Sequence, residues 1–579
     1  GGSLYVDTAG TYNADNSLLT FTATNAGQQI GAGSSSTINL YDVAFTGIGG
    51  EWAVQTPIVV DQDIAVTAGT VVGISDIEVV NGDFSGDGLV AMTGGTVQLN
   101  SDNTFGGVNS WQFNNLVLGD GGTAGITTPA GNATTTVLDT LTIASGHFLD
   151  NGSMTLDLAG SGNVFVRNGT FIQDTGTVRY SGLTPNILRT PYYNLVVDTD
   201  SGLSVDATAP VTGLQVLGNL TVGAIGTSTI DLNSADPLTA VNGNVYIGSL
   251  GTVEASDVGT LNVFADWDND GTFIGNGGLV QFLQATGTVI VAAGVSPFAN
   301  VIVARNSNYT FTESATSTGN FTIGTSQFVL QSGEMLEVGG EFVNNMGDTD
   351  TTWTGTTLKL TSGTAYNVNA KATGDTYDII EITTNTHPRF WNSDATAFVT
   401  EPDASAYSMD HATVDGDLYI FGDFVNTSYN DHWSYARDFD GAALGSPRLA
   451  NVQIEDGGSV LYLGGSLTSL GTTSASTTIS AQGAGPYTIT LGGTTTIDMQ
   501  YYSVREITAD GLIITGSPSV TELSRGDFEV TNAGGSAITV GGSVISVNPA
   551  KNFTNNRFAT TTAINAFNVT ATGTSLSSW

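Results

Sequence analysis

The chain contains no cysteine and very few basic residues. Its 579 residues include 13 Lys plus Arg against 53 Asp plus Glu, which gives a formal net charge of −40 at pH 7. The absence of cysteine excludes disulfides and thiolate metal sites. The shortage of Lys and Arg argues against nucleic acid and anionic lipid as partners, because both are bound through clusters of positive charge. The acidity is compatible with divalent cations, with cationic surfaces, or with solubility alone.

Long apolar runs are missing as well. No stretch of about 18 apolar residues occurs, so the sequence predicts no membrane span. Charged residues make up only 11% of the chain, and 75 residues are Gly. The remainder is rich in Thr, Val and Ile, which favour strands, and in Gly, Asn and Asp, which favour turns. This composition predicts short strands alternating with turns, and it does not fit long helices.

A strand of the type Gly-Thr-Val-polar-apolar returns along the chain. Its copies begin at Gly95, Gly176, Gly278 and Gly355, so the gaps are 81, 102 and 77 residues. Near-periodic self-similarity of this kind predicts a stacked repeat fold, in which no unit buries its apolar face alone.

Further landmark strands divide each long repeat into shorter steps of 16 to 27 residues, mostly in the low twenties. They begin at Trp111, Tyr192 and Phe298, at Leu138, Leu217 and Gly319, and at Gly162, Gly243 and Gly340. Alternation of polar and apolar residues, as in Asn219-Leu220-Thr221-Val222, points every second side chain inward. About 20 residues suffice for two or three short strands and their turns.

These observations predict an all-β fold, a parallel β-helix (β-solenoid) with coils of roughly 20–25 residues. Tandem β-sandwich domains of about 100 residues are the alternative, although they do not readily explain the short step. Low-complexity disorder is a second alternative, against which the 40% hydrophobic content and the alternation argue.

Four segments follow from these patterns. Residues 1–50 form an N-terminal β segment that serves as a cap or assembly segment, and residues 51–383 form β-helix repeats. Residues 384–449 break the pattern and form an irregular excursion, and residues 450–579 resume the coils.

The excursion holds aromatic and histidine side chains that we single out as a binding surface: Trp391, Trp433, Tyr435, His387 and His432. Loops extruded from a regular scaffold often carry function, and aromatic rings supply stacking faces for sugars. The alternative is that these rings only pad the side of the solenoid.

One segment resembles a metal-binding loop. Asp266-x-Asp268-x-Asp270-Gly271 matches the first half of a Ca²⁺ loop, but Gly277 stands where the bidentate Glu is expected. Ca²⁺ is therefore the one cofactor that the sequence suggests, and an Asx-rich turn is the alternative. We expect no other cofactor.

The N-terminal strands are our candidates for self-association. Leu4-Tyr5-Val6 and Leu18-Leu19-Thr20-Phe21 supply the apolar residues Leu4, Tyr5, Val6, Leu18, Leu19 and Phe21. The end of a β-helix exposes unpaired N–H and C=O groups, which join readily to another strand. Self-association into a polymer or lattice is the expected partnership.

Enzymatic activity is not expected. Polysaccharide hydrolases and lyases occur on β-helices, and they need paired carboxylates or Ca²⁺ with a basic proton acceptor. The sequence marks no such carboxylate pair, and Lys359, Lys371 and Lys551 are the only lysines. A β-helical polysaccharide-degrading enzyme stays an alternative.

The recurrent Gly-Thr-Val strand, Tyr193-Asn194-Leu195-Val196-Val197, Gly218-Asn219-Leu220-Thr221-Val222 and the segment 266–273 together resemble a known type of protein. It is the β-strand-repeat surface protein of bacteria, most of all the large surface proteins of candidate-phyla (Patescibacteria-type) bacteria. The resemblance covers residues 80–579. It implies an extracellular, cell-surface structural protein that forms a surface layer, stalk or filament, and it carries over no catalytic residue or ligand. An adhesin that binds host glycans or proteins through residues 384–447 is the alternative function.

Overall fold

The computed structural model of the chain is an all-β parallel β-solenoid of about 18 turns, roughly 22 residues apart, with almost no helix. It describes residues 1–361 except 8–11, 13–14, 34–36, 132, 200–204, 211 and 347–349. Beyond these it describes the strand backbones at 365–370, 375–377, 379–382, 387–392, 412–414, 417–420, 424–427, 451–454, 459–462 and 466–470, and then 477–481, 486–493, 495–529, 534–547, 553–559 and 567–573. Side chains are described up to residue 361 and again from residue 479 in most of the later segments.

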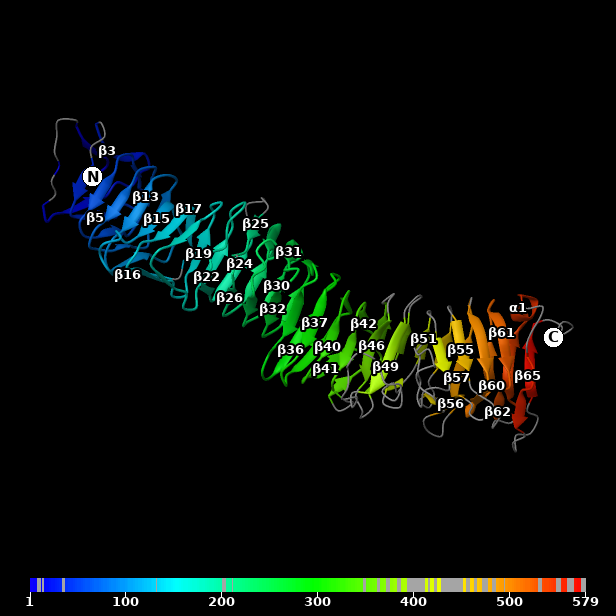
Figure 1. Cartoon of the computed structure of the whole chain (residues 1–579). Coiled ribbons are helices and arrows are strands. Elements are labelled where there is room, and N and C mark those ends of the chain that lie inside the picture. Colours follow the sequence, from blue (N-terminus) through cyan, green and yellow to red (C-terminus); the bar gives the residue numbers. More distant parts are fainter. Residues whose placement is uncertain are drawn as a thin grey trace. The chain divides into compact units, whose positions relative to one another are not determined.

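The chain divides into two compact units, which are residues 1–278 (unit 1) and 279–579 (unit 2). Figure 1 shows the strands of each unit stacked as successive rungs. The pairings between described strands are parallel, as a solenoid requires, and the alternative of tandem β-sandwiches is therefore wrong.

The landmark strands of each long repeat lie directly above one another. In unit 1, β13 (Thr96–Leu99), β15 (Trp111–Leu118), β17 (Thr135–Ile143) and β20 (Phe165–Arg167) stack in register. Their inward side chains form one column, which runs Val97, Leu116, Leu141, Phe165. The next repeat gives the column Val178, Leu195, Leu220, Val245, and unit 2 gives Val280, Val301, Phe321, Phe342. The four landmark strands of a long repeat thus lie on successive coils, and the short step in the sequence is the coil.

Alternating burial along each strand explains why these residues form coils. β22 (Thr177–Tyr180) buries Val178 and Tyr180 and turns the other two residues outward. The interior also holds rows of aromatic rings, such as Phe84, Trp111 and Phe113 in unit 1, with centroids 5.0 to 6.2 Å apart. Burying a large apolar side chain stabilises a fold by about 1.5–3 kcal/mol. Since each ring packs against neighbouring coils, the coils stabilise one another.

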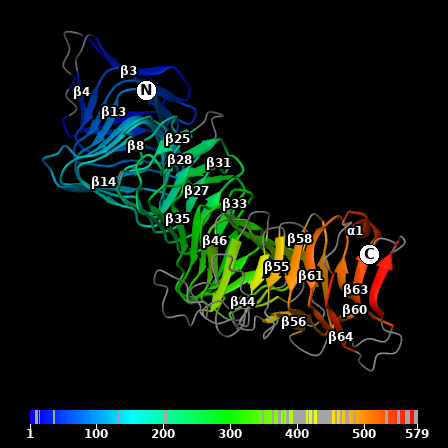
Figure 2. The ribbon, with the colours of Figure 1, turned by 45° about the vertical axis from the view of Figure 1, so that its right-hand side comes forward.

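The second sheet of unit 1 positions the candidate site. Its eight strands are β2 (Leu18–Phe21), β5 (Asp42–Phe45), β8 (Ile64–Val66), β11 (Phe84–Ser85), β14 (Asn103–Gly106), β16 (Gly125–Pro129), β18 (His147–Asp150) and β21 (Thr170–Ile172). One face of this sheet lies on the core and the other faces solvent. Beyond β21 the coil is rebuilt, and the strands β23 (Pro191–Tyr192) and β25 (Val205–Thr208) start new sheets; Figure 2 labels β25.

Unit 2 continues the same construction around a ten-stranded parallel sheet. That sheet consists of β39 (Ala315–Ser317), β42 (Met335–Val338), β45 (Thr357–Leu360), β48 (Ile379–Ile382), β51 (Asp417–Ile420), β54 (Ser459–Tyr462), β57 (Tyr487–Leu491), β60 (Ile507–Ile514), β63 (Ser536–Gly541) and β65 (Phe567–Thr572). Within the described residues the one helix is α1 (Gly542–Val547).

The backbone register locates the two long insertions of unit 2. Ile380 is paired with Leu418, and Asp417 with Ser459. Both separations along the chain are well above the usual step of roughly 22 residues. The sheet therefore runs through the region 384–449, and the extra residues lie between its strands.

Candidate functional site

Three aspartates form a column on the outward face of the second sheet of unit 1. Oδ1 of Asp42 accepts a hydrogen bond from the backbone N–H of Asp63 (3.1 Å), and Oδ1 of Asp63 accepts one from the N–H of Asp83 (2.8 Å). Oδ1 of Asp83 in turn accepts from the N–H of Thr104 (2.7 Å). Each carboxylate thus satisfies a backbone donor of the next coil, and we call the three residues the aspartate ladder.

The ladder is strongly negative and sterically open. Its members are one coil apart, about 4.8 Å along the stack, so their charges repel one another. Residues 1–166 contain no Lys or Arg. On the same face, two residues further along each strand, stand the small side chains Ala44, Ala65 and Ser85, which pair laterally with one another. A partner could therefore approach this face closely.

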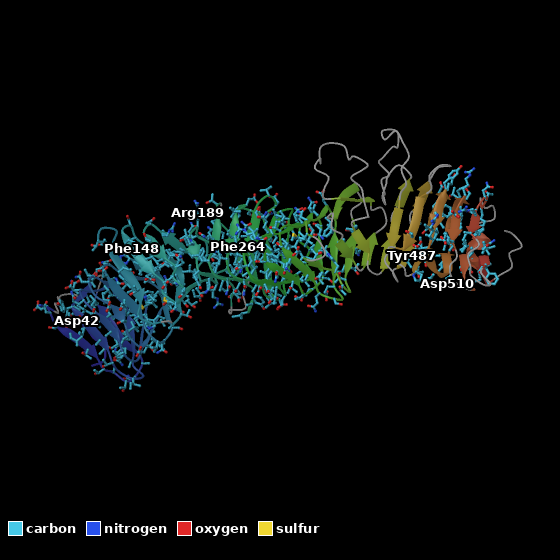
Figure 3. All side chains as sticks on the ribbon, turned by 90° about the horizontal axis from the view of Figure 1, so that it is seen from below. Asp42, Phe148, Arg189, Phe264, Tyr487 and Asp510 are labelled. Carbon is cyan, nitrogen blue, oxygen red and sulfur yellow. The ribbon has the colours of Figure 1, made fainter. Side chains whose placement is uncertain are left out.

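Large apolar residues occupy the same face of the sheet in its later strands. Ile126 in β16 pairs laterally with Phe148 in β18, and Ile172 lies in β21 beside Asp150. Their side chains remain 37%, 41% and 36% exposed, respectively. We call Ile126, Phe148 and Ile172 the apolar patch. Figure 3 labels Phe148 on the cyan part of unit 1 and Asp42 on the blue part.

The positive charge of unit 1 is concentrated near β21, the last strand of this sheet. The three arginines of residues 1–278 are Arg167, Arg179 and Arg189, and the unit has no Lys. Arg167 shortly precedes β21 and is exposed, and Arg189 is exposed on the following coil. We call Arg167 and Arg189 the arginine corner.

The arginine corner is held by hydrogen bonds. Nη1 of Arg167 donates to Oγ1 of Thr190 (2.9 Å), and Nη2 donates to the backbone carbonyl of Arg189 (3.3 Å). Arg179 is engaged differently, since its Nε donates to the carbonyl of Asp198 (3.1 Å). The guanidinium of Arg167 therefore fixes the backbone from which the Arg189 side chain extends.

Two buried tyrosines anchor the segment that carries Arg189. The Tyr192 hydroxyl donates to the carbonyl of Leu188 (2.6 Å), and the N–H of Leu188 donates to the Tyr180 hydroxyl (3.1 Å). Burial raises the pKa of Tyr180 to about 12 and raises the pKa of Tyr192 well above its ordinary value, so both stay neutral. The corner therefore rests on a rigid base.

The sequence analysis did not identify these groups. A signal for the ladder was present, because Asp42, Asp63 and Asp83 precede apolar strand residues at intervals close to the coil step. The clustering of Arg167, Arg179 and Arg189 in one short stretch of an acidic chain was a second signal. Neither signal showed which face of the coil the side chains occupy.

The predicted assembly residues lie on the two N-terminal strands of unit 1. β1 (Leu4–Val6) pairs with β3 (Gln28–Ala32), and β2 pairs with β5. Within the described part of the chain neither β1 nor β2 has a partner on its other edge. Tyr5 and Leu18 are 69% and 61% exposed.

The inward residues of these two strands differ in burial. Leu4, Val6 and Leu19 are partly exposed, and Phe21 is buried, where it stacks on Phe45 with ring centroids 5.0 Å apart. The core is therefore only partly closed above the first coil. These observations place the six residues at an edge and do not test assembly.

The three aspartates of the calcium hypothesis lie on and beside one strand. β33 (Trp267–Asn269) buries Trp267 and Asn269 and turns Asp268 outward, and Asp270 is exposed directly after it. The N–H of Asp266 donates to Oδ1 of Asn244 (3.1 Å), so Asp266 belongs to a ladder that runs through Asn194, Asn219 and Asn244. In the described residues no group of three or more His, Asp or Glu side chains is placed to hold a metal ion. Calcium binding at this segment stays a prediction.

The structure describes no side chain of the predicted binding residues in the excursion. Trp433, Tyr435 and His432 lie outside the described residues. His387 and Trp391 belong to β49 (His387–Asn392), which pairs in parallel with β46 (Ala365–Ala370), but only its backbone is described. Whether these side chains form a surface stays a prediction.

Comparisons with known proteins identify no relative. No family model matches the chain, and neither the curated proteins nor the solved structures contain a match. Among the described helices none has the length and apolar character needed to cross a membrane. The β-solenoid fold that the resemblance implied is confirmed. The role of a bacterial surface protein that it also implied stays a prediction.

Proposed function

We propose that the chain is an extracellular structural protein of the cell surface, a subunit of a surface layer, stalk or filament that assembles through strand edges, and that it is not an enzyme. The observation that carries the proposal is the parallel β-solenoid itself, because its coils are joined through strand edges. β1 and β2 are hydrogen-bonded to the described residues on one side only, while the inward side chains Leu4 and Val6 remain partly exposed.

The energetic argument follows from the stacking of coils. One coil further on, the inward residue Ile30 is fully buried, because a coil covers it on each side. A strand of a second chain laid on β1 and β2 would complete the backbone hydrogen bonds and bury the exposed apolar surface. Such a contact repeats the geometry that the solenoid uses internally, so it needs no new kind of interface.

The test is electron microscopy of the full chain and of a variant with residues 1–24 deleted. We expect ordered polymers for the full chain and their loss on deletion. Because a deletion exposes the next coil, the second variant carries Tyr5→Lys and Leu18→Lys, which place charge on the two edge strands without removing them.

The matched control is Ile290→Lys with Val295→Lys, which adds the same charge at exposed positions of unit 2 (48% and 97% exposed). The proposal requires polymers in the control and none in the edge variant. Polymers that persist in the deletion and in the lysine variant would show that these strands do not join copies.

The adhesin alternative concerns residues 384–447, most of which lie outside the described part of the chain. Glycan binding that disappears in Trp391→Ala with Trp433→Ala would establish it. It therefore stays a prediction with its own experiment.

A further inference from the structure

We infer that the solvent-facing side of the second sheet of unit 1 is a self-recognition surface, on which the apolar patch and arginine corner of one copy dock on the aspartate ladder of a second copy. The inference deepens the proposed function and rests on it for its biological setting. It concerns the side of the solenoid and is independent of the strand edges.

The first argument is electrostatic. A chain of net charge −40 repels its own copies at low ionic strength, so a stable contact must place positive charge against negative charge. In unit 1 the exposed positive side chains are Arg167 and Arg189, and residues 1–166 are free of Lys and Arg. The ladder within those residues, on the second sheet, is the complementary acidic surface.

The second argument is spacing. Asp42, Asp63 and Asp83 follow one another by single coils, as the bonds from each carboxylate to the next backbone N–H show. Arg167 and Arg189 are also one coil apart, since the guanidinium of Arg167 reaches the carbonyl of Arg189. Successive carboxylates of the ladder are about 4.8 Å apart, and the hydrogen bond from Arg167 to the backbone of Arg189 keeps the two arginines close together, so both can face the ladder at once.

The third argument is shape. Ile126, Phe148 and Ile172 project from the later strands of the sheet, whereas Ala44, Ala65 and Ser85 leave the earlier strands nearly flat beside the ladder. An exposed group of large apolar residues next to charged residues is typical of a protein contact surface. The apolar patch of one copy can therefore pack on the small side chains beside the ladder of a second copy without steric conflict.

The contact must join two molecules. The strand of Asp83 is separated from β21, next to Arg167, by β14, β16 and β18, which makes four steps or about 19 Å. No arginine side chain spans that distance within one copy. Because the donor surface and the acceptor surface are different, the contact is heterologous, and it can continue from copy to copy.

The test uses sedimentation velocity of the full chain at low and high NaCl. The donor variant carries Phe148→Thr and Arg189→Gln; Thr170 already occupies the same column as Phe148, so Thr fits the strand. The acceptor variant carries Asp42→Asn, Asp63→Asn and Asp83→Asn, which keeps the Oδ1 acceptors and removes the charges. To weaken polymerisation through the edge strand β1, all chains carry Tyr5→Lys; Leu18 is left unchanged because it pairs laterally with Asp42 of the ladder.

We expect the parent chain to associate more weakly as salt rises, and each variant to weaken association at least about threefold, because exposed charge pairs are modest and are screened by salt. Ile290→Thr with Arg305→Gln, a matched change in unit 2, should leave association unchanged. A mixture of donor and acceptor variants should recover a 1:1 dimer, since each retains one intact surface.

Several results would overturn the inference. One is association that is equal in all variants, and another is equal weakening in the control and the donor variant, which would reflect net charge alone. A third is a polyanion such as polygalacturonate binding through Arg189 while self-association is unaffected, which would assign the corner to a different ligand. If the chain without the lysine change still polymerises through its strand edges in any of these cases, the proposed function stands and only the inferred surface is excluded. A chain that never associates, with or without the lysine edge change, removes both proposals.

Discussion

The hydroxyl oxygens of Tyr180 and Tyr192 lie 2.8 Å apart in the interior of unit 1. Tyr192 already donates its proton to the carbonyl of Leu188, so the hydroxyl of Tyr180 must donate to that of Tyr192. The two rings meet edge to face with centroids 6.3 Å apart. This pair holds the backbone N–H and carbonyl of Leu188, the residue directly before Arg189.

Tyr180→Phe should destabilise unit 1 by about 1–3 kcal/mol, because the partly buried N–H of Leu188 loses its acceptor. Tyr193→Phe is the control, since the half-buried Tyr193 hydroxyl makes no hydrogen bond among the described residues. Chemical unfolding followed by circular dichroism measures the difference. Equal stability of Tyr180→Phe and Tyr193→Phe would contradict the role of the pair.

The buried His147 should make unit 1 sensitive to acid. Its Nε2 lies 2.7 Å from Oγ1 of Thr127, and burial lowers the pKa of His147 below 6.5, more strongly than nearby Asp102 and Asp120 raise it. The unfolded chain therefore binds a proton at a higher pH than the folded chain. Stability is fully present above pH 6.5 and falls below it, by up to about 1.4 kcal/mol per pH unit, until the pH reaches the folded pKa.

His147→Gln should flatten this dependence, because Gln does not titrate. Unfolding midpoints between pH 7 and pH 5 compare the two proteins, and the carboxylates that both share cancel in the difference. Parallel curves for the two proteins would rule out His147 as the origin.

Asp266→Asn should change stability by less than about 0.5 kcal/mol, because Asn194, Asn219 and Asn244 serve the same ladder position. Asn219→Leu, which removes the acceptor for the N–H of Asn244, should be worse by about 1 kcal/mol. Thermal unfolding with and without added Ca²⁺ examines the same segment. A Ca²⁺-dependent rise in the midpoint that Asp268→Asn abolishes would establish the metal site and assign Asp266 a second role.

Gly182→Ala should be strongly destabilising, since a methyl group at Gly182 would collide with the backbone carbonyl of Gly160 on the preceding coil. Separating two coils at one point breaks neighbouring ladder bonds, and a loss of about 2 kcal/mol or more follows. Gly122→Ala is the matched control, because only the Asp120 carboxylate lies near, at 3.7 Å or more. Comparable unfolding midpoints for the two variants would show that the coils tolerate separation at Gly182.

Local sequence is sufficient for the architecture because stacking acts between neighbouring coils. Inward residues alternate with outward residues along most strands whose side chains are described, and the landmarks beginning at Gly95, Trp111, Leu138 and Gly162 recur near the coil step. The column of Val97, Leu116, Leu141 and Phe165 was therefore implicit in the sequence. A parallel solenoid follows, since that pattern buries apolar residues only when coils lie in register.

The candidate surface could not be inferred in the same way. Asp63 and Arg189 are outward residues, whose identity the core does not constrain, and the number of residues in each corner decides which face they reach. Where β21 ends its sheet and the coil is rebuilt, the sequence carries no mark of the change. The sequence by itself therefore determined how the chain winds, because burial of alternate residues is a local requirement. Only the tertiary structure decided which charged and apolar side chains share one face, because that depends on the summed geometry of many turns.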